Sequence, residues 1–295
     1  MRISHTIEEV RRAVAGARSQ AAVIGFVPTM GFLHDGHLSL IEVAREAGAT
    51  FVVVSIFVNP LQFAPTDDFD RYPRDEKRDT ALLEAAGVDL LFLPAVATMY
   101  PPDAATGVRI RGVAEGLEGE RRPGHFDGVA TVVAKLFNLV QPDLAVFGRK
   151  DAQQCAVIDR MVRDLDMPVR LVFGETVREP DGLARSSRNS YLSTAEREKA
   201  PALHRALRAG EEAILHGVLQ ADAIEKLMRR VVAEVGGVEV DYLAVVDPET
   251  FATPADFDRD LLLAGAVRVG RTRLIDNVRI ARRDIPHTRE NVPAR

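Results

Sequence analysis

The sequence predicts an α/β protein in which a doubly wound (Rossmann-like) parallel sheet over residues 1–174 precedes a smaller α+β domain over residues 175–295. Up to Gly174, short apolar runs alternate with segments whose apolar residues recur at helical spacing. Several runs, such as Phe51–Val58, are apolar almost throughout, which is typical of strands covered on both faces. Repeated alternation of strand and helix implies parallel strands joined by right-handed crossovers.

The elements of the first domain follow from apolar spacing and from the residues that interrupt it. A strand over Ala22–Val27 ends at Pro28, and a helix over Leu38–Ala47 ends before Gly48. Pro73 can occupy the first turn of a helix that runs to Ala86 and stops at Gly87. The other predicted elements are strands Phe51–Val58, Val88–Leu93, Leu144–Phe147 and Val169–Phe173, and helices Val129–Val140 and Ala152–Leu165.

The order of elements reverses in the second domain. The pattern predicts helices Ala195–His216 and Ala221–Val235, followed by strands Val238–Val246 and Leu261–Val269. Helices first and strands later indicate an α+β arrangement rather than a continued parallel sheet. No long Gly/Ser-rich stretch separates the halves, so we expect the second domain to pack closely and to cover an active site in the first.

Composition and charge bound the classes of function. The 295 residues carry 38 Lys plus Arg against 43 Asp plus Glu, a net charge of −5, which argues against a nucleic-acid partner. With 46% hydrophobic and 27% charged residues, the chain resembles an ordinary globular protein. Cys155 is the single cysteine, which excludes an intrachain disulfide and a cysteine-pair zinc site. Without a 20-residue apolar span or a signal-peptide core, we expect a cytoplasmic protein with no membrane partner.

The segment Pro28–His37 lies between the first predicted strand and helix, where open parallel sheets bind ligands. Backbone N–H groups at a helix N-terminus stabilise a phosphate, and Gly31 and Gly36 allow close approach. His34 and His37 can each donate a hydrogen bond to a phosphate oxygen. The alternative is that both histidines only solvate a helix cap. The pattern matches the His-x-Gly-His signature of the nucleotidyltransferase superfamily.

Two further motifs fit phosphate binding. In Phe147–Asp151, another predicted strand-to-helix turn, Lys150 can reach a phosphate, while Asp151 can cap the helix or orient a magnesium-bound water. In Ser186–Asn189, at the start of the second domain, two hydroxyls and Arg188 can hold a triphosphate. The alternatives are a helix cap with a solvated lysine and a serine-rich turn.

Together these motifs resemble the pantothenate synthetase family, the pantoate–β-alanine ligases, over most of the chain. The matching segments, in order, are Pro28–His37, Phe57–Phe63, Tyr72–Arg74, Arg122–Val133, Gly148–Gln154 and Asp181–Leu192. Several motifs in one order are far more specific than any one of them.

The resemblance implies that pantoate attacks the α-phosphate of ATP to form a bound pantoyl adenylate, and that the β-alanine amine then displaces AMP. It implies ATP as co-substrate and Mg²⁺ as cofactor, with the metal ligands left open. The catalytic positions it implies are His37, His34, Lys150 and Arg188. The ATP-binding positions are Met30, Gly31, His34, His37, Gly148, Arg149, Lys150, Asp151, Val177, Arg185, Ser186, Ser187 and Arg188. The positions for pantoate and β-alanine are Gln62, Gln154, Asn59, Met30, Val132 and Val133.

Some of these residues have a plainer interpretation. Val132 and Val133 fit the core side of a helix equally well, and Gln62 could be a solvated loop amide. Arg149 and Arg185 depart from the family, which more often has Glu or Gln at the first position and Met or Leu at the second. Both add positive charge beside the expected phosphate site.

Two other features need no role in catalysis. We interpret Cys155 as a small core residue. The charged run Asp67–Asp79 is expected to be a solvated loop and helix face, with the loop before Tyr72 as a candidate lid.

The resemblance also implies a homodimer. Two other classes of function stay open: an adenylyltransferase or synthetase with a different acceptor, and a nucleotide sensor that has lost turnover. Substitution of Gln62 and Gln154 distinguishes a pantoate ligase from an enzyme with a different acceptor. In a pantoate ligase it should weaken the use of pantoate while leaving ATP binding largely intact.

Overall fold

The computed structural model describes residues 1–64 and 69–286, in which the chain forms two compact units. The first comprises Met1–Val177 and Arg185–Ser187, and the second comprises Arg178–Ala184 and the described residues from Arg188 onward. The sequence predicts a division after residue 174, and the chain first passes into the second unit after Val177. The sequence does not predict the return of the chain to the first unit at Arg185–Ser187.

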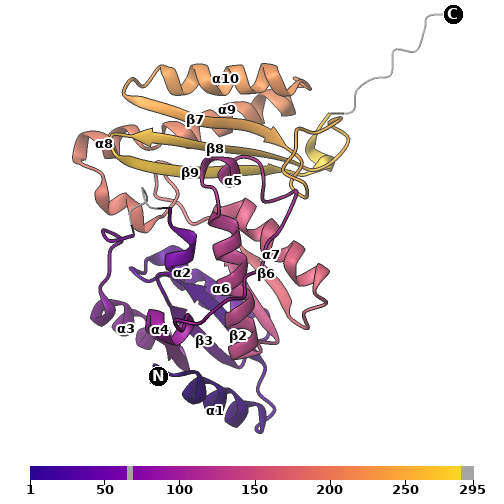
Figure 1. Ribbon diagram of the computed structural model, residues 1–295. Coiled ribbons are helices and arrows are strands. Elements are labelled where there is room, and N and C mark those ends of the chain that lie inside the picture. Colours follow the sequence, from indigo (N-terminus) through magenta and orange to yellow (C-terminus); the bar gives the residue numbers. More distant parts are fainter. Residues whose placement is uncertain (65–68, 287–295) are drawn as a thin grey trace, which may run out of the picture. The chain divides into compact units, whose positions relative to one another are not determined.

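The first unit is built on a parallel sheet, as the sequence predicts (Figure 1). Among the described residues its strand order is β1-β4-β3-β2-β5-β6. The strands are β1 (Arg2–Ser4), β2 (Ile24–Thr29), β3 (Phe51–Ile56), β4 (Leu90–Phe92), β5 (Leu144–Gly148) and β6 (Arg170–Gly174). From β2 the chain builds outward through β3 and β4 on one side, while β5 and β6 lie on the other. Ligands of doubly wound sheets bind at the carboxyl ends of strands where the order reverses, here β2 and β5.

Helices cover both faces of this sheet. Val27 of β2 packs into a core with Ile41 of α2 (Asp35–Glu46) and Leu83 of α3 (Glu76–Ala85). The neighbouring residue Phe26 points to the opposite face, where its ring meets Phe137 of α6 (His125–Val140) at a centroid distance of 6.4 Å. This alternation is the two-residue period of a strand buried on both sides. The remaining helices of the unit are α1 (Ile7–Arg18), α4 (Val96–Met99), α5 (Glu118–Arg121) and α7 (Ala152–Asp164).

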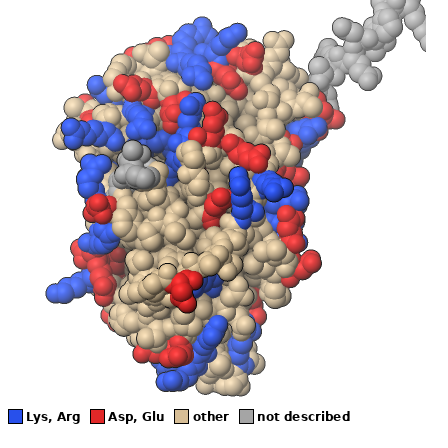
Figure 2. Space-filling view, in the orientation of Figure 1, with Lys and Arg blue, Asp and Glu red and all other residues tan. Residues whose placement is uncertain are grey.

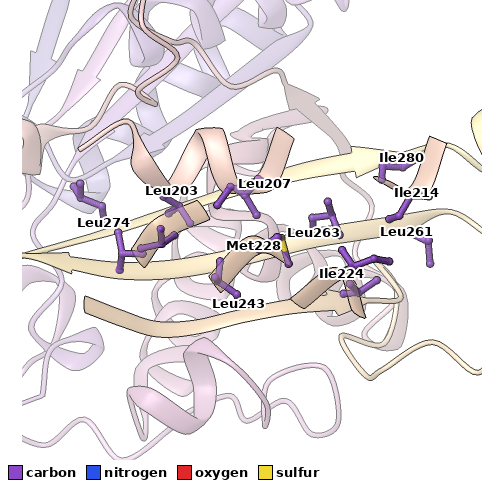
Figure 3. Packing of buried hydrophobic residues seen from close by; sticks show 14 of the residues in the cluster. Leu203, Leu207, Ile214, Ile224, Met228, Leu243, Leu261, Leu263, Leu274 and Ile280 are labelled. Atoms are coloured by element: carbon purple, nitrogen blue, oxygen red, sulfur yellow. The ribbon is translucent and has the colours of Figure 1, made fainter. Parts of the chain in front are cut away.

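The second unit is an antiparallel sheet with helices packed against it. Its strands are β7 (Val238–Val246), β8 (Leu261–Val269) and β9 (Thr272–Ile280), and its helices are α8 (Thr194–Lys199), α9 (Ala202–Leu215) and α10 (Ala221–Ala233). Figure 3 shows Leu207 of α9 and Met228 of α10 directed toward Leu263 of β8. The predicted fold class, a Rossmann-like α/β domain with a smaller α+β domain, is therefore confirmed.

Several elements differ from the sequence-based prediction. The helix expected over Ala195–His216 is two helices, because Pro201 has no N–H to donate and α8 ends at Lys199. Helix α3 begins at Glu76 behind the cap residue Asp75, not at Pro73. Strands β1 and β9 and helix α1 were not predicted, although the capping box of Thr6 and Glu9 marks the start of α1.

Charged residues of both signs lie on the surface, and the described helices are not of the membrane-spanning kind. On the face shown in Figure 2, Lys and Arg side chains are mixed with Asp and Glu side chains. None of the helices in residues 1–64 and 69–286 combines the length and the apolar character needed to cross a bilayer.

Candidate active site

The loop that follows β2 has a backbone that only certain residues can adopt. Gly31 has a φ of +82°, and a Cβ there would lie 2.9 Å from Cγ2 of Ile56, so both conformation and space require glycine. The next residue, Phe32, also has a positive φ, of +50°. A non-glycine residue in this region costs about 1 kcal/mol or more, and surrounding contacts must therefore hold it.

Those contacts come from Asp79 on α3. The backbone N–H groups of Phe32 and Leu33 donate to the two Asp79 carboxylate oxygens at 2.6 and 2.8 Å. Asp79 is only 1% exposed, and burial raises its pKa although the two amides act to lower it. The sequence predicts that the charged run up to Asp79 is solvated. This prediction is wrong for Asp79 itself, because its buried carboxylate holds the loop through the N–H groups of Phe32 and Leu33. Asp67 and Asp68, which belong to the candidate lid, lie outside the described residues.

The side chains of both signature histidines accept hydrogen bonds from backbone N–H groups at the start of α2. His34 is the N-cap residue, and its Nδ1 accepts a hydrogen bond from the N–H of Gly36 at 3.1 Å. Nδ1 of His37 accepts one from the N–H of His34 at 3.3 Å, which completes a capping box. Because Nδ1 is the acceptor in both neutral rings, we infer that each proton is on Nε2. The cap interpretation and the phosphate interpretation are thus compatible, since the cap leaves an Nε2–H donor on each ring.

The electrostatic environment keeps both rings neutral. Burial, followed by the positive charge of Lys150, lowers the pKa of His34 to about 4. Burial and the neighbouring His34 lower the pKa of His37 well below its usual value. The ring centroids lie 4.0 Å apart, so two positive charges would repel at that distance.

The loop amides differ from the phosphate cradle expected from the sequence. The N–H of Gly31 donates to Oγ1 of Thr29 at 3.2 Å. The amides of Phe32, Leu33, His34 and Gly36 donate to side chains as described above. These N–H groups already have acceptors within the protein, so a phosphate at this loop would depend mainly on side-chain donors.

The turn after β5 brings Lys150 to the same edge of the sheet. Residues Arg149–Asp151 form a short 3-10 helix, and Nζ of Lys150 lies 3.7 Å from Oδ1 of Asp151. Asp151 occupies the N-cap position of α7, but the described structure gives its side chain no capping bond. Arg149 is directed toward Glu175 at 3.0 Å, with its guanidinium over the ring of Phe173. Gly148, the last residue of β5, precedes this turn.

The segment that re-enters the first unit at Arg185 contacts the signature loop. The N–H of Arg185 donates to the carbonyl of Val177 at 2.9 Å, and its guanidinium lies 3.4 Å from the carboxylate of Asp35. The buried hydroxyl of Ser187 donates to the carbonyl of Phe32 at 3.1 Å. Ser186 lies between these two residues, and Arg188 begins the stretch that belongs to the second unit.

A buried amide pair lies beside the loop. Asn59, the N-cap residue of the 3-10 helix η1 (Pro60–Gln62), and Gln62, its last residue, are only 1% and 8% exposed. Nδ2 of Asn59 donates to Oε1 of Gln62 at 3.1 Å, and Nε2 of Gln62 donates to Sδ of Met30 at 3.2 Å. The alternative of Gln62 as a solvated loop amide is therefore wrong.

Helices α6 and α7 carry the other expected substrate positions. Val132 and Val133 are buried on α6, and Gln154 is half-buried on α7. Gln153, by contrast, is an anchor: its Nε2 donates to the carbonyls of Val113 and Gly116 at 2.9 and 2.8 Å. Cys155 is buried, and burial raises its thiol pKa, which fits the core role expected of it.

Three residues that support the site have no role predicted from the sequence. Asp79 accepts from the N–H of Phe32, Tyr100 donates to the side-chain Oδ1 of Asn59, and His125 contacts the backbone carbonyl of Gln62. They lie 41 to 63 residues from their partners, beyond any local motif. His125 belongs to a recognised segment, which was the one available signal.

A Rossmann-like sheet with paired imidazoles at its switch point defines a nucleotide-binding enzyme of the α/β class. The profile of the family described as pantoate-beta-alanine ligase matches residues 2–279, and the chain belongs to this family. The family assignment and the enzyme class expected from the sequence, a ligase, are confirmed.

Relatives and solved structures agree with this assignment. The chain is 52% identical to a pantothenate synthetase of Herpetosiphon aurantiacus and 51% identical to one of Gluconobacter oxydans, in each case over 94% of this chain and 99% of the relative. The crystal structure of pantothenate synthetase from Thermus thermophilus superposes with a TM-score of 0.88 at 50% identity, covering 94% of this chain and 99% of that one. The Francisella tularensis enzyme, solved with β,γ-ATP and β-alanine, gives 0.78 at 32% identity over 94% and 97%.

Proposed function

We propose that this protein condenses pantoate with β-alanine to give pantothenate, with ATP converted to AMP and pyrophosphate through an enzyme-bound pantoyl adenylate. The observation that carries the proposal is the pair of imidazoles at the N-terminus of α2, whose ring centroids lie 4.0 Å apart and where the charge of Lys150 helps to lower the pKa of His34. The complex of the Francisella tularensis relative with an ATP compound and β-alanine supports the substrate assignment.

In the first step, a pantoate carboxylate oxygen bonds to the α-phosphorus of ATP as the bond to the pyrophosphate oxygen breaks. Negative charge builds on the departing pyrophosphate, and preorganised donors stabilise such charge best. We assign this task to His34, His37, Lys150, Ser186 and Arg188, while the Ser187 hydroxyl, which donates to the carbonyl of Phe32, supports the loop. Neutral imidazoles donating from Nε2, with the Lys150 ammonium, supply donors without forcing two charged rings together.

In the second step, the β-alanine amine attacks the acyl carbon of the adenylate, AMP leaves and the nitrogen loses a proton. Both steps depend on positioning and electrostatics rather than on a protein nucleophile. We assign Gln62 and Gln154 to the polar groups of pantoate and β-alanine, with Asn59 assisting through its hydrogen bond to Gln62, and Met30, Val132 and Val133 to the apolar part of pantoate. Gly31, Gly148, Arg149, Asp151, Val177 and Arg185 are assigned to the surroundings of the nucleotide.

Mg²⁺ fits this site as a partner of the nucleotide. In residues 1–64 and 69–286, no three His, Cys, Asp or Glu side chains are arranged to hold a metal. Mg²⁺ typically keeps several waters and binds through one or two carboxylates plus substrate phosphates, so Asp151 beside Lys150 suffices as a protein ligand. The bound ion would neutralise phosphate charge. A homodimer and a cytoplasmic location complete the proposal.

The test is an assay of AMP formation with ATP, Mg²⁺, pantoate and β-alanine, in which each component is omitted in turn. AMP release that needs all four, with pantothenate identified by mass spectrometry, is the expected result. ATP binding without pantoate-dependent AMP formation or pyrophosphate exchange would leave an adenylyltransferase with another acceptor, or a nucleotide sensor. Gln62→Ala should then leave activity with the true acceptor unaffected.

A further inference from the structure

We propose that Tyr100 is a specificity-determining positioning residue, which acts through Asn59 to fix the Gln62 amide so that it presents an N–H donor to an oxygen of pantoate. This inference rests on the proposed function, in which Gln62 binds pantoate. Tyr100 directly follows α4 and belongs to none of the segments assigned to catalysis or binding.

The side-chain amide of Asn59 is held from both ends. The Tyr100 hydroxyl donates to Oδ1 of Asn59 at 2.9 Å, and the N–H of Leu61 donates to the same oxygen at 3.3 Å. On the other side, Nδ2 of Asn59 donates to the carbonyl of Gly128 at 3.0 Å and to Oε1 of Gln62 at 3.1 Å. A flipped Asn59 would set its oxygen against two acceptors and its NH₂ against a backbone donor. The amide therefore has one orientation, with its hydrogen-bonding capacity used within the protein.

The orientation of Asn59 determines that of Gln62. Because Oε1 of Gln62 accepts from Asn59, its Nε2 must face the other way, where it lies 3.2 Å from Sδ of Met30. A thioether is a weak acceptor, so this contact holds the NH₂ group without a strong competitor. A carboxylate or hydroxyl oxygen that arrives there gains a full hydrogen bond. The opposite rotamer would present a carbonyl, which repels a carboxylate.

The main chain of Gln62 is anchored separately. Its carbonyl accepts from Nδ1 of His125 at 2.9 Å and from Nη2 of Arg122 at 3.3 Å. Nη1 of Arg122 lies 3.1 Å from Nε2 of His125, which makes Nε2 the acceptor and Nδ1 the donor of that ring. Burial, followed by the charge of Arg122, lowers the pKa of His125 to about 4, so the ring stays neutral. Loss of the Tyr100 hydroxyl therefore removes one of the two donors to Oδ1 of Asn59 and loosens the Asn59–Gln62 amide pair, while the main chain of η1 stays in place.

Tyr100 suits this task because its hydroxyl stays protonated and its ring is packed independently. Burial raises the pKa of Tyr100 to about 12, so it remains a donor at neutral pH. The ring lies 6.0 Å from that of Phe57, and Nζ of Lys135 lies 5.8 Å from its centroid. Tyr100→Phe keeps these ring contacts and removes the donor alone.

The experiment compares Tyr100→Phe with Lys135→Met, a control that alters a ring contact but keeps the hydroxyl. We expect Tyr100→Phe to raise the KM for pantoate about three- to tenfold, the effect of one hydrogen bond, with the KM for ATP within about twofold of wild type. Lys135→Met should leave both constants near wild type. Thermal unfolding midpoints of the three proteins establish that all are folded.

The outcomes separate this inference from the proposed function. If wild type makes pantothenate and Tyr100→Phe has an unchanged KM for pantoate, the positioning role is overturned alone. If the KM for pantoate rises equally in Tyr100→Phe and Lys135→Met, the effect comes from ring packing, and the positioning role is overturned as well. If wild type does not use pantoate at all, the proposed function fails and this inference fails with it.

Discussion

Asp79 accepts a hydrogen bond from the backbone N–H of Phe32 at 2.6 Å, and this contact fixes the left-handed residue two positions before His34. The second carboxylate oxygen accepts from Leu33, so both oxygens of a buried side chain hold the signature loop. The backbone that leads into His34 is thus held by Asp79 of α3, which lies 46 residues after Leu33 in the chain.

Asp79→Asn should uncouple the loop from α3. The amide offers one acceptor where two are needed and turns an NH₂ toward a backbone donor, a loss of about 1.5–3 kcal/mol for a charge-assisted contact. We expect turnover in the AMP assay to fall about 10- to 100-fold.

The matched control is Asp75→Asn on the same helix, since Asp75 caps α3 by accepting from the N–H of Arg78. Asparagine is also a good cap, so this variant should behave like wild type. An Asp79→Asn enzyme with wild-type turnover would contradict the role of Asp79.

Substitutions at His37 separate the cap from the donor. His37→Asn places an oxygen near the position of Nδ1 and so keeps the cap, but it removes the outward Nε2–H. If the donor stabilises charge on the departing pyrophosphate, kcat should fall about 100- to 1000-fold. His37→Gln places an NH₂ near the position of Nε2 and should recover part of that loss. A decrease under threefold in His37→Asn would show that the ring serves only as a cap.

The spacing of apolar residues in the sequence predicted most helices and strands, but it did not predict the contacts between residues far apart in the chain. Strands β7 and β8 have the predicted bounds, because their apolar runs end at clear interruptions. Pro201 was visible in the sequence, yet apolar spacing on both sides of it favoured one helix. The candidate site shows the same limit of prediction from local sequence. The loops that carry its residues could be predicted, because they lie between a predicted strand and a predicted helix. The hydrogen bond between Asp79 and Phe32 could not, because the two residues share no local sequence pattern.

Glycine at position 128 should prove essential for the placement of Gln62. A Cβ there would lie 2.3 Å from the carbonyl oxygen of Leu61 and 2.6 Å from the nitrogen of Gln62, so α6 and η1 would have to separate. We expect Gly128→Ala to lower the free energy of unfolding by about 1–3 kcal/mol and to raise the KM for pantoate. Gly16→Ala in α1 is the control, because no atom lies within 4 Å of its Cβ position. Gly16→Ala should be stabilised by about 0.5–1 kcal/mol. If Gly128→Ala has a free energy of unfolding and a KM for pantoate similar to those of Gly16→Ala, glycine is not required at position 128.

The second unit contains a buried carboxylate, Asp276, that should make its stability depend on acid pH. Arg178 donates to both oxygens of Asp276, at 2.6 and 2.9 Å, and Nδ1 of His204 lies 3.5 Å from the same carboxylate. Burial acts to raise the pKa of Asp276, but the contacts with His204 and Arg178 outweigh it and hold the pKa below its usual value. Removing one partner of a buried pair costs about 3 kcal/mol, so Asp276→Asn should be that much less stable at pH 7.

The pH dependence has a definite sign. Because the folded-state pKa of Asp276 is depressed, its contribution is complete above the ordinary aspartate pKa of about 3.9 and is lost as pH falls through the folded value. Urea unfolding followed by circular dichroism should therefore show the difference in free energy of unfolding between wild type and Asp276→Asn narrowing below about pH 4. Asp260→Asn is the control, since the half-exposed ion pair of Asp260 with Arg279 should contribute less than about 1 kcal/mol. A gap that stays the same down to pH 3 would mean that packing, rather than the charge of Asp276, accounts for the loss.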